Sequence, residues 1–369
     1  MLAELKKVFK SMDKMLLTTV LLLTLIGFVM IYSATISYGN PLKFTIVQFA
    51  AFAIGFAIML FLVKMDYENF GNKTKIIYAI NVVVLVLVLF LGTGDEVGTR
   101  GWIRIGGIGI QPSELVKIGF VLTFAKHLEQ NEDGVNKFLP FLGMLAHAGA
   151  IILIVLLQPD YGTAMVYAFM FICMVFAAGI KYRTILIALG AFAAFAPVAW
   201  FFILKDYQKD RFITFFNPEH DPIGRGYQVI QSKISIGSGE FAGNGLFSGP
   251  QTQLGILPAK HTDFILGVIG EEFGFIGCLI VLVLLFALII KCFKTGIEAR
   301  SGYGKYLCIG IGAMLLFQTF ENIGMCIGVM PVTGIPLPFL SYGGSSMLTS
   351  MIAVGLVMSV SARKKMIKF

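Results

Sequence analysis

Long runs of apolar residues alternate with short polar stretches along almost the whole chain. A helix needs about 20 apolar residues to cross a bilayer, and ten runs reach or approach that length, with 115–128 the shortest. The pattern predicts an all-α polytopic membrane protein that forms a single transmembrane domain over residues 1–369. The ten expected spans are 15–35, 43–63, 75–92, 115–128, 139–157, 161–180, 184–204, 263–290, 306–329 and 338–361.

Composition agrees with this pattern, because 57% of the residues are hydrophobic and only 14% are charged. These values lie far outside the range of soluble globular proteins and exclude that class. The five cysteines all fall within or at the edges of the expected spans. We therefore expect packing roles for them and no disulfide framework.

The basic residues predict the orientation in the membrane. The first apolar run follows a Lys-rich start and has no small-residue cleavage site, so we interpret it as a retained span. An even number of spans puts both termini on one side, and most of the 29 Lys and Arg lie in inward segments when that side is the cytoplasm. The net charge of +8 then reflects this inward bias and contact with membrane lipids, and it does not indicate nucleic-acid binding.

Two long segments, 93–114 and 205–262, face outward in this topology. The second joins the seventh and eighth spans as a large extracytoplasmic loop without obvious structure, and loops of this length are often functional. It mixes Arg225 and glycines with aromatic residues, so we expect a surface that closes over something polar. In the first segment, Trp102 is typical of a bilayer-interface anchor, and the adjacent Arg100 is a candidate contact for phosphate.

The eighth span begins with an unusual concentration of carboxylates, in the sequence TDFILGVIGEEFGFIG at 262–277. An ionisable group at membrane depth is costly and marks a functional site by default. Thr262 or Asp263 could cap the helix. Because Thr262 alone suffices, Asp263 is a candidate general base. Glu271 and Glu272 lie deeper on other faces of the helix, where structural pairing is the favoured interpretation.

Two more outward corners carry carboxylates. In QPSELVK at 111–117, Pro112 suits the start of a helix, and Glu114 in its first turn can pair with Lys117 three residues later. A structural ion pair and a direct substrate contact both remain open for these two residues. At 158–160, Asp160 follows a Gln-Pro pair and is expected to cap the next helix or to support a neighbouring group.

Taken together, these motifs resemble the SEDS family of bacterial cell-wall proteins, and within it most closely the RodA elongation type. The resemblance covers nearly the whole chain, in the family's order and roughly its spacing. Its segments are QPSELVK (111–117), QPDYGTA (158–164), NPEHDPIGRGYQVIQSKISIGSG (217–239), HTDFILGVIGEEFGFIG (261–277) and ENIGMCIGVMPVTGIPLPFLSYGGSS (321–346).

The resemblance implies a peptidoglycan glycosyltransferase that polymerises lipid II at the outer face of the bacterial cytoplasmic membrane, in cell elongation and shape. The family's essential aspartate corresponds to Asp263, which would deprotonate the 4-hydroxyl of the acceptor so that it displaces undecaprenyl pyrophosphate in an inverting transfer. The family's Glu and Lys correspond to Glu114 and Lys117. Lys117, Arg100 and Arg225, a divalent cation (Mg²⁺ or Mn²⁺), or both would stabilise the leaving pyrophosphate.

The same resemblance extends the expected site and names a partner. It adds Gln111 and His261 to the substrate-binding residues and Glu321 to the supporting residues, beside those at 160, 271 and 272. Family members work with a class B penicillin-binding protein, a single-span transpeptidase. The chain departs from the family's usual Leu-Pro-Glu-x-His before the aspartate, because Ala259 and Lys260 follow Pro258.

Two other functions remain as alternatives. A lipid II flippase would also use interior carboxylates, but a transporter needs a continuous polar path to the cytoplasmic side. The ionisable residues of the expected spans concentrate instead toward the outer half. The third function is a non-catalytic scaffold of the wall-synthesis complex.

Overall fold

The computed structural model describes residues 12–94, 101–105, 108–198, 201–202, 209, 213–221 and 224–364. Each of the ten expected spans coincides with a helix, which confirms the fold class. The ten helices are α2 (Lys14–Thr35), α3 (Pro41–Lys64), α5 (Thr74–Leu91), α6 (Pro112–Gln130), α7 (Phe138–Leu157), α8 (Tyr161–Ala177), α9 (Tyr182–Val198), α13 (Ile265–Ile297), α14 (Gly302–Ile327) and α15 (Gly344–Ala362).

Seven of these helices, among the described residues, are long and apolar enough to cross a membrane: α2, α3, α5, α7, α13, α14 and α15. Helix α8 is apolar but has only 17 residues. Helix α6 was the weakest of the expected spans, and its first half carries Glu114 and Lys117. The chain is therefore a multi-pass membrane protein in which the helices with polar or short sequences depend on their neighbours.

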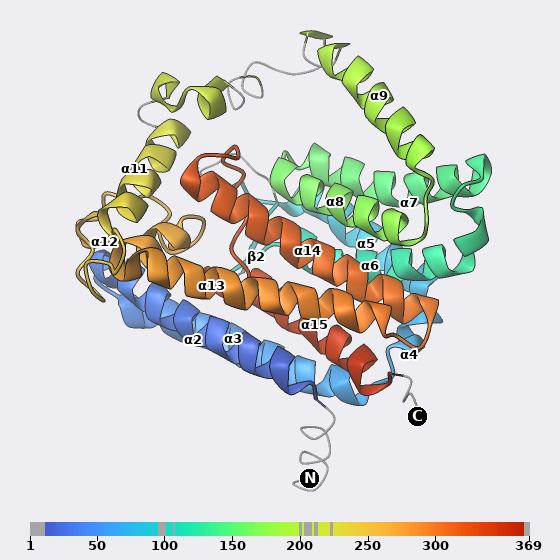
Figure 1. Cartoon of the computed structure of the whole chain (residues 1–369), viewed down its shortest axis with the longest axis horizontal. Helices are drawn as coiled ribbons and strands as arrows, with labels where there is room; N and C mark the ends of the chain where they lie inside the picture. Colours follow the sequence, from blue (N-terminus) through green and yellow to red (C-terminus); the bar gives the residue numbers. More distant parts are fainter. Residues whose placement is uncertain are drawn as a thin grey trace, which may run out of the picture.

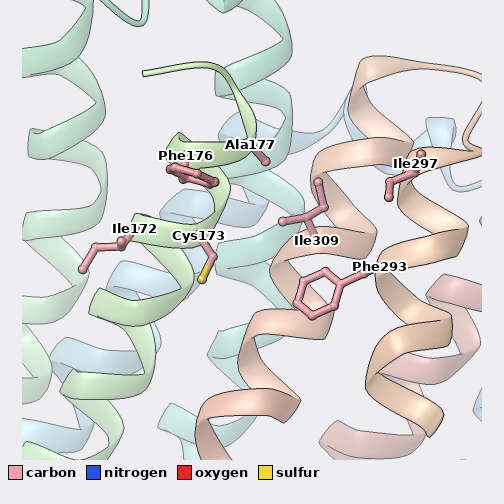
Figure 2. A pocket seen from close by; sticks show the side chains of 7 residues that line it. All are labelled: Ile172, Cys173, Phe176, Ala177, Phe293, Ile297 and Ile309. Carbon is pink, nitrogen blue, oxygen red and sulfur yellow. The ribbon is translucent and has the colours of Figure 1, made fainter. Parts of the chain in front are cut away.

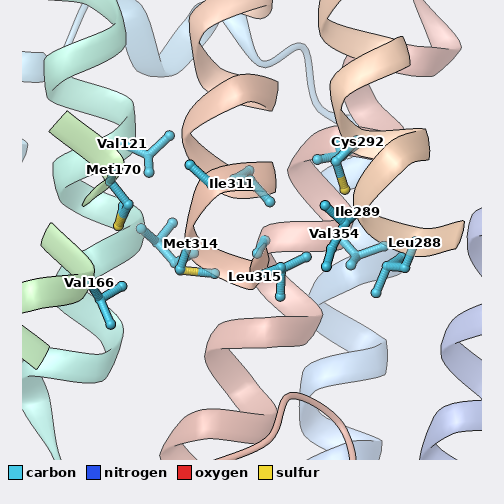
Figure 3. Packing of buried hydrophobic residues seen from close by; sticks show 14 of the residues in the cluster. Val121, Val166, Met170, Leu288, Ile289, Cys292, Ile311, Met314, Leu315 and Val354 are labelled. Carbon is cyan, nitrogen blue, oxygen red and sulfur yellow. The ribbon is translucent and has the colours of Figure 1, made fainter. Parts of the chain in front are cut away.

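Helices α14 and α15 occupy the centre of the bundle (Figure 1). In their apolar stretches 78% of the residues are buried, against 17% in α5. Figure 3 shows side chains of α6, α8 and α13 meeting Ile311, Met314 and Leu315 of α14. The most polar long helices thus lie inside the protein, and the most apolar ones face outward, as expected in lipid.

Helices α3 and α15 pack closely because each places a glycine against the other. A Cβ atom at Gly55 would lie 2.8 Å from the Cβ of Met351, and one at Gly355 would lie 3.0 Å from the Cα of Met59. Small residues of this kind let helix backbones approach within a membrane. The contact holds the middle of α15, the helix that follows the segment 331–343, against α3.

The two long polar segments that were predicted to face outward contain regular structure. In 93–114 two short antiparallel strands, β1 (Ile103–Ile105) and β2 (Ile108–Ile110), form a hairpin against which Trp102 packs at Gly109. The large loop contains η4 (Pro218–His220), α11 (Arg225–Ser238) and α12 (Pro250–Gln253), so the expectation of a loop without structure was wrong for these parts of it. The remaining short elements are η1 (Ile36–Tyr38), α4 (Glu68–Gly71) and η2 (Glu132–Gly134).

All five cysteines are reduced and lie in helices α8, α13 and α14, as the sequence predicted.

Candidate active site

The entrance of α13 places Asp263 at the edge of the protein, where its side chain is partly exposed. The expected cap by Thr262 or Asp263 was wrong, because Phe264 occupies the N-cap position and makes no side-chain cap bond. The preceding turn closes on itself instead: the Thr262 hydroxyl and the Phe264 amide both donate to the carbonyl of Ala259, at 3.2 Å each. The local turn therefore presents Asp263 without using its carboxylate as the N-cap.

A buried side-chain amide on α14 holds the backbone of Asp263 in position. Asn322 donates from its side-chain nitrogen to the carbonyl oxygen of Asp263 at 2.7 Å and to that of Ile335 at 2.8 Å. A Cβ atom at Gly334 would lie 3.5 Å from Oδ2 of Asp263. The carboxylate therefore lies opposite the proline-rich segment 331–337, and one side chain connects both backbones.

The segment 331–337 joins this corner to the start of α8. Thr333 donates from its hydroxyl to Oε1 of Glu321 at 3.0 Å. On the other side, a Cβ atom at Gly162 would lie 3.0 Å from Ile335 and 3.1 Å from Thr333. The segment thus bridges two of the outward corners that the sequence singled out, and Glu321 supports it from α14.

Asp160 caps α8 and anchors the start of α6. Its Oδ1 accepts from the amide of Thr163 at 3.0 Å. Its Oδ2 accepts from Nε2 of Gln111 at 2.9 Å and from the hydroxyl of Ser113 at 3.5 Å. Burial raises the pKa of Asp160. The side chain of Gln111 is therefore already engaged within the protein, while its backbone amide donates to Ser345 of α15 at 3.0 Å.

Glu114 and Lys117 form a buried ion pair one turn into α6. Nζ of Lys117 lies 2.6 Å from Oε1 of Glu114, and the exposed fractions of the two side chains are 0% for Lys117 and 4% for Glu114. Oε2 of Glu114 is buried and has no hydrogen-bond partner among the described residues. Because the amine is enclosed, a ligand can reach it only if the pair opens. A role for either residue in substrate binding stays a prediction.

Glu271 and Glu272 both have internal partners, in agreement with the structural interpretation. Glu271 accepts from the amides of Gln251 (2.6 Å) and Thr252 (2.9 Å) and from the Thr252 hydroxyl (2.6 Å). It thereby caps the start of α12. Glu272 accepts from the hydroxyl of Ser33 on α2 and from Nε2 of Gln253 at 3.3 Å. These carboxylates attach the outer loop to the bundle.

The glycine-rich stretch 239–245 enters a break in α13, which the sequence did not predict. Gly274 has φ +63°, outside the helical region. The amides of Asn244 and Gly245 donate to the carbonyls of Glu271 and Glu272, at 2.9 and 3.1 Å. Two amides beyond the break, at 275 and 276, donate to carbonyls at 240 and 241. A Cβ atom at Gly243 would lie 2.2 Å from the Glu272 oxygen. The glycines therefore serve this backbone contact.

Lys260 has a structural role that the sequence did not predict. It is fully buried, and its Nζ donates to the hydroxyl of Ser37 at 2.5 Å and to the carbonyl of Thr252. The amine also lies 5.1 Å from the centre of the Tyr38 ring. Burial lowers its pKa, and the charge of Glu271 opposes that change. Its departure from the family pattern was visible in the sequence, but its partners were not.

Three expected contributors could not be placed as expected. Arg100 lies outside the described residues, and for Arg225 only the backbone at the start of α11 is described. For the expected Mg²⁺ or Mn²⁺, no group of three or more His, Cys, Asp or Glu among the described residues is arranged to hold a metal ion. These contributions to pyrophosphate binding stay predictions.

An apolar cavity of about 290 Å³ lies between α8, α13 and α14 (Figure 2). It is near the C-terminal end of α13, some 30 residues beyond Asp263. Its lining offers no carboxylate, amide or hydroxyl for substrate chemistry: Ile172, Cys173, Phe176, Ala177, Phe293, Ile297 and Ile309. The candidate site is therefore the polar end of the bundle around Asp263 and not this cavity.

Comparison with known proteins agrees with the motifs. Residues 13–366 match the cell cycle protein family that groups FtsW, RodA and SpoVE. The chain belongs to this family. Among curated family members, it is 36% identical over 365 residues to "Peptidoglycan glycosyltransferase MrdB" of Escherichia coli K12, covering 96% of each chain. It is also 36% identical over 378 residues to "Probable peptidoglycan glycosyltransferase FtsW" of Trichlorobacter lovleyi, covering 99% of this chain and 98% of the relative.

Solved structures of family members share the fold along nearly the whole chain. A chain from a structure described as "Structural coordination of polymerization and crosslinking by a peptidoglycan synthase complex" matches with TM-score 0.83 and 30% identity, over 96% of this chain and 98% of that one. The rod shape determining protein RodA of Thermus thermophilus matches with TM-score 0.71 and 26% identity, over 96% and 98%. The similarity therefore includes the segments that build the Asp263 corner.

Proposed function

We propose that this protein is a peptidoglycan glycosyltransferase that polymerises lipid II at the outer face of the cytoplasmic membrane. The observation that carries the proposal is the geometry of Asp263, whose partly exposed carboxylate lies at a helix entrance opposite Gly334. Its backbone is held by the buried Asn322. A carboxylate that is positioned by its support and reaches the protein surface suits proton transfer to a bound substrate.

In the proposed reaction Asp263 accepts the proton of the 4-hydroxyl of the acceptor N-acetylglucosamine. The hydroxyl oxygen attacks C1 of the donor N-acetylmuramic acid, and the bond from C1 to undecaprenyl pyrophosphate breaks. A single displacement of this kind inverts the configuration at C1. The pyrophosphate leaves with its negative charge, which Lys117, Arg100 and Arg225 are candidates to stabilise.

The proposed orientation has both termini in the cytoplasm, so that Asp263 faces outward. Residues in the outer loop, such as the exposed Ser248, should then be accessible from outside the cell. A Ser248→Cys variant in intact spheroplasts should react with a membrane-impermeant maleimide, while the native cysteines stay buried or within helices. Labelling only after lysis would reverse the topology and remove the outward site.

The decisive experiment uses purified protein in proteoliposomes with fluorescent lipid II. Wild type, alone or with its class B penicillin-binding protein, should produce glycan chains that a gel resolves, and Asp263→Asn should not. Glu240→Gln is the matched control, because this carboxylate is exposed on the same outer loop and should leave polymerisation unchanged.

The same preparation separates the alternatives. A flippase would move fluorescent lipid II between leaflets without forming chains, and would lose this movement in Asp263→Asn. A scaffold would show neither activity, and its Asp263→Asn variant would support wall synthesis as well as wild type does.

The partner is proposed from the family and from the synthase complex that the chain resembles. A class B penicillin-binding protein would supply the crosslinking reaction, which needs a transpeptidase that this chain does not resemble. Co-purification of the two proteins from membranes, with and without the partner's single span, tests this association. We further propose a role in elongation and cell shape, to be tested by depletion and measurement of cell length and width.

A further inference from the structure

Four rings, one of them that of His261, form a group two residues before Asp263. They come from separate parts of the chain: Tyr38 in η1, Phe44 in α3, His261 itself, and Tyr342 before α15. The centre of the His261 ring lies 5.3 Å from that of Tyr38, 5.4 Å from that of Phe44 and 5.5 Å from that of Tyr342. Phe44 is also 5.8 Å from Tyr38 and 5.4 Å from Tyr342. The rings thus form one cluster.

The cluster is built rigidly. The amide of Tyr342 donates to the carbonyl of His261 at 2.8 Å, and the Tyr38 hydroxyl lies 3.4 Å from Nδ1 of His261. Beneath Tyr38 the buried amine of Lys260 lies 5.1 Å from the ring centre, in the range of a cation–π contact. The relative positions of the rings are therefore set before any ligand arrives.

The cluster also reaches the protein surface. Tyr38 is 45% exposed, and Phe44, His261 and Tyr342 are partly exposed. Burial, and then the charge of Lys260, lower the pKa of His261 to about 4. The imidazole is therefore neutral near pH 7, and the surface offers uncharged rings, two of which carry tyrosine hydroxyls.

A bilayer-interface anchor is the simplest role for outer aromatic residues. That role explains tyrosines whose hydroxyls reach the headgroups, but it does not require three rings to converge on one histidine. It gives no reason for the partly buried Phe44, which has no polar group to place at the interface. The cluster resembles a binding surface more closely, since such surfaces combine aromatic walls with a few polar groups.

We propose that Tyr38, Phe44, His261 and Tyr342 form a platform that binds the pyranose ring of an N-acetylated hexosamine beside Asp263. One face of such a ring presents C–H groups of slightly positive charge, which suit the negative face of an aromatic ring. Its hydroxyl and acetamido groups lie at the ring edge, where they can form hydrogen bonds with neighbouring polar groups. The proposal deepens the proposed function and rests on it, because it assigns the sugar-binding surface of that same site.

The platform predicts a particular kinetic signature. Stacking acts on the sugar before and during the reaction, so its loss should raise KM more than it lowers kcat. Phe44→Ala should raise KM for lipid II by about fivefold to tenfold, the effect expected for loss of one aromatic contact. Phe44→Tyr keeps a ring and should restore a KM close to that of wild type. Phe90→Ala is the matched control, because this ring is 81% exposed at the outer end of α5 and lies outside the cluster.

A binding experiment without turnover separates this proposal from the proposed function. The full-length protein in nanodiscs is mixed with chitotetraose, a soluble oligosaccharide of N-acetylglucosamine, and saturation-transfer NMR detects the bound sugar. Wild type and Phe90→Ala should give equal signals on the C–H protons of one ring face, and Phe44→Ala and Tyr342→Leu should weaken them at least about fivefold.

Equal signals in wild type and Phe44→Ala would overturn the platform and leave the rings as interface anchors, as would no signal in wild type. If wild type polymerises no lipid II yet binds chitotetraose through these rings, the proposed function fails while the sugar platform stands as a binding site. Thermal unfolding of each variant shows whether a lost signal reflects lost structure.

Discussion

Helix α13 carries carboxylates in two places that differ in how the protein surrounds them. At its break, Glu271 accepts three hydrogen bonds from 251–252, and Glu272 is enclosed by Ser33 and Gln253. At its entrance, Asp263 is partly exposed and is positioned through its backbone by Asn322. The comparison teaches that a carboxylate enclosed at the helix break supports structure, whereas a partly exposed carboxylate at the helix entrance can reach a substrate.

The largest expected effect lies at the entrance. Asp263→Asn should reduce polymerisation by about 10²–10⁴-fold, the usual contribution of a general base, because the amide cannot accept the proton. Its thermal unfolding should stay close to that of wild type, since Asn has nearly the same size as Asp and the contact of Asn322 with the backbone carbonyl is kept. A polymerisation assay with initial rates and a melting curve on the same preparation check this. Retention of more than about a tenth of the activity would remove Asp263 from the role of general base.

Glu271→Ala should show the opposite behaviour. It removes three hydrogen bonds and leaves the amides at the start of α12 without partners, so unfolding should become easier by about 3 kcal/mol. The fraction that remains folded should keep most of its activity. The comparison of melting temperature with activity per folded molecule tests this. If Glu271→Ala abolished activity without changing stability, Glu271 would act in the reaction, and its assignment as a structural carboxylate would be wrong.

Gly274→Ala should destabilise only the break in α13 and the segment 239–245 that contacts it. Its φ of +63° is unfavourable for alanine, and a Cβ atom would lie 2.5 Å from the amide nitrogen of Gly243, so we expect a loss of about 1–3 kcal/mol. Gly237→Ala in α11 is the matched control, because nothing lies within 4 Å of the added Cβ. Limited proteolysis of 239–253 should become faster in the first variant and stay unchanged in the second.

The smallest effect concerns pH at the entrance. The pKa of His261 is about 4, below its ordinary 6.5, mainly because of burial. The unfolded chain therefore binds more protons than the folded one between these values, and stability falls as pH falls through this window. Lowering the pH from 7 to 5 should cost wild type about 2 kcal/mol more than it costs His261→Gln. Melting curves at both pH values measure the difference, and identical curves would contradict the neutral buried ring.

The sequence predicted the helices well because each span is encoded by a local run of apolar residues. It also singled out Asp263, whose role as general base stays a prediction. The partners of Glu114 and Asp160 follow from spacings of three residues within a single turn or cap. It did not predict the entry of 239–245 into α13, since that contact pairs backbone atoms of distant segments and leaves only scattered glycines as a signal. The partners of Lys260 were missed for the same reason.

The N-cap of α13 shows another limit. Thr262 and Asp263 are both good capping residues, yet the turn that begins at Ala259 places Phe264 at the N-cap. The position of each residue within this turn, in which Ala259 has a φ of +45°, outweighed the general preference of Thr and Asp for the N-cap. The aromatic cluster around His261 was equally hidden, because its rings come from four segments that only the folded bundle brings together.

The bifurcated contact of Asn322 has a mechanical consequence. One planar amide on α14 ties the peptide of residue 263 to that of residue 335, so the two backbones behave as a single rigid unit hinged on that helix. A tilt of α14 would move Asp263 and the facing segment 331–337 together and would keep the distance between them unchanged. Motions of the other helices can therefore open or close the approach to Asp263 without changing its position relative to the segment 331–337.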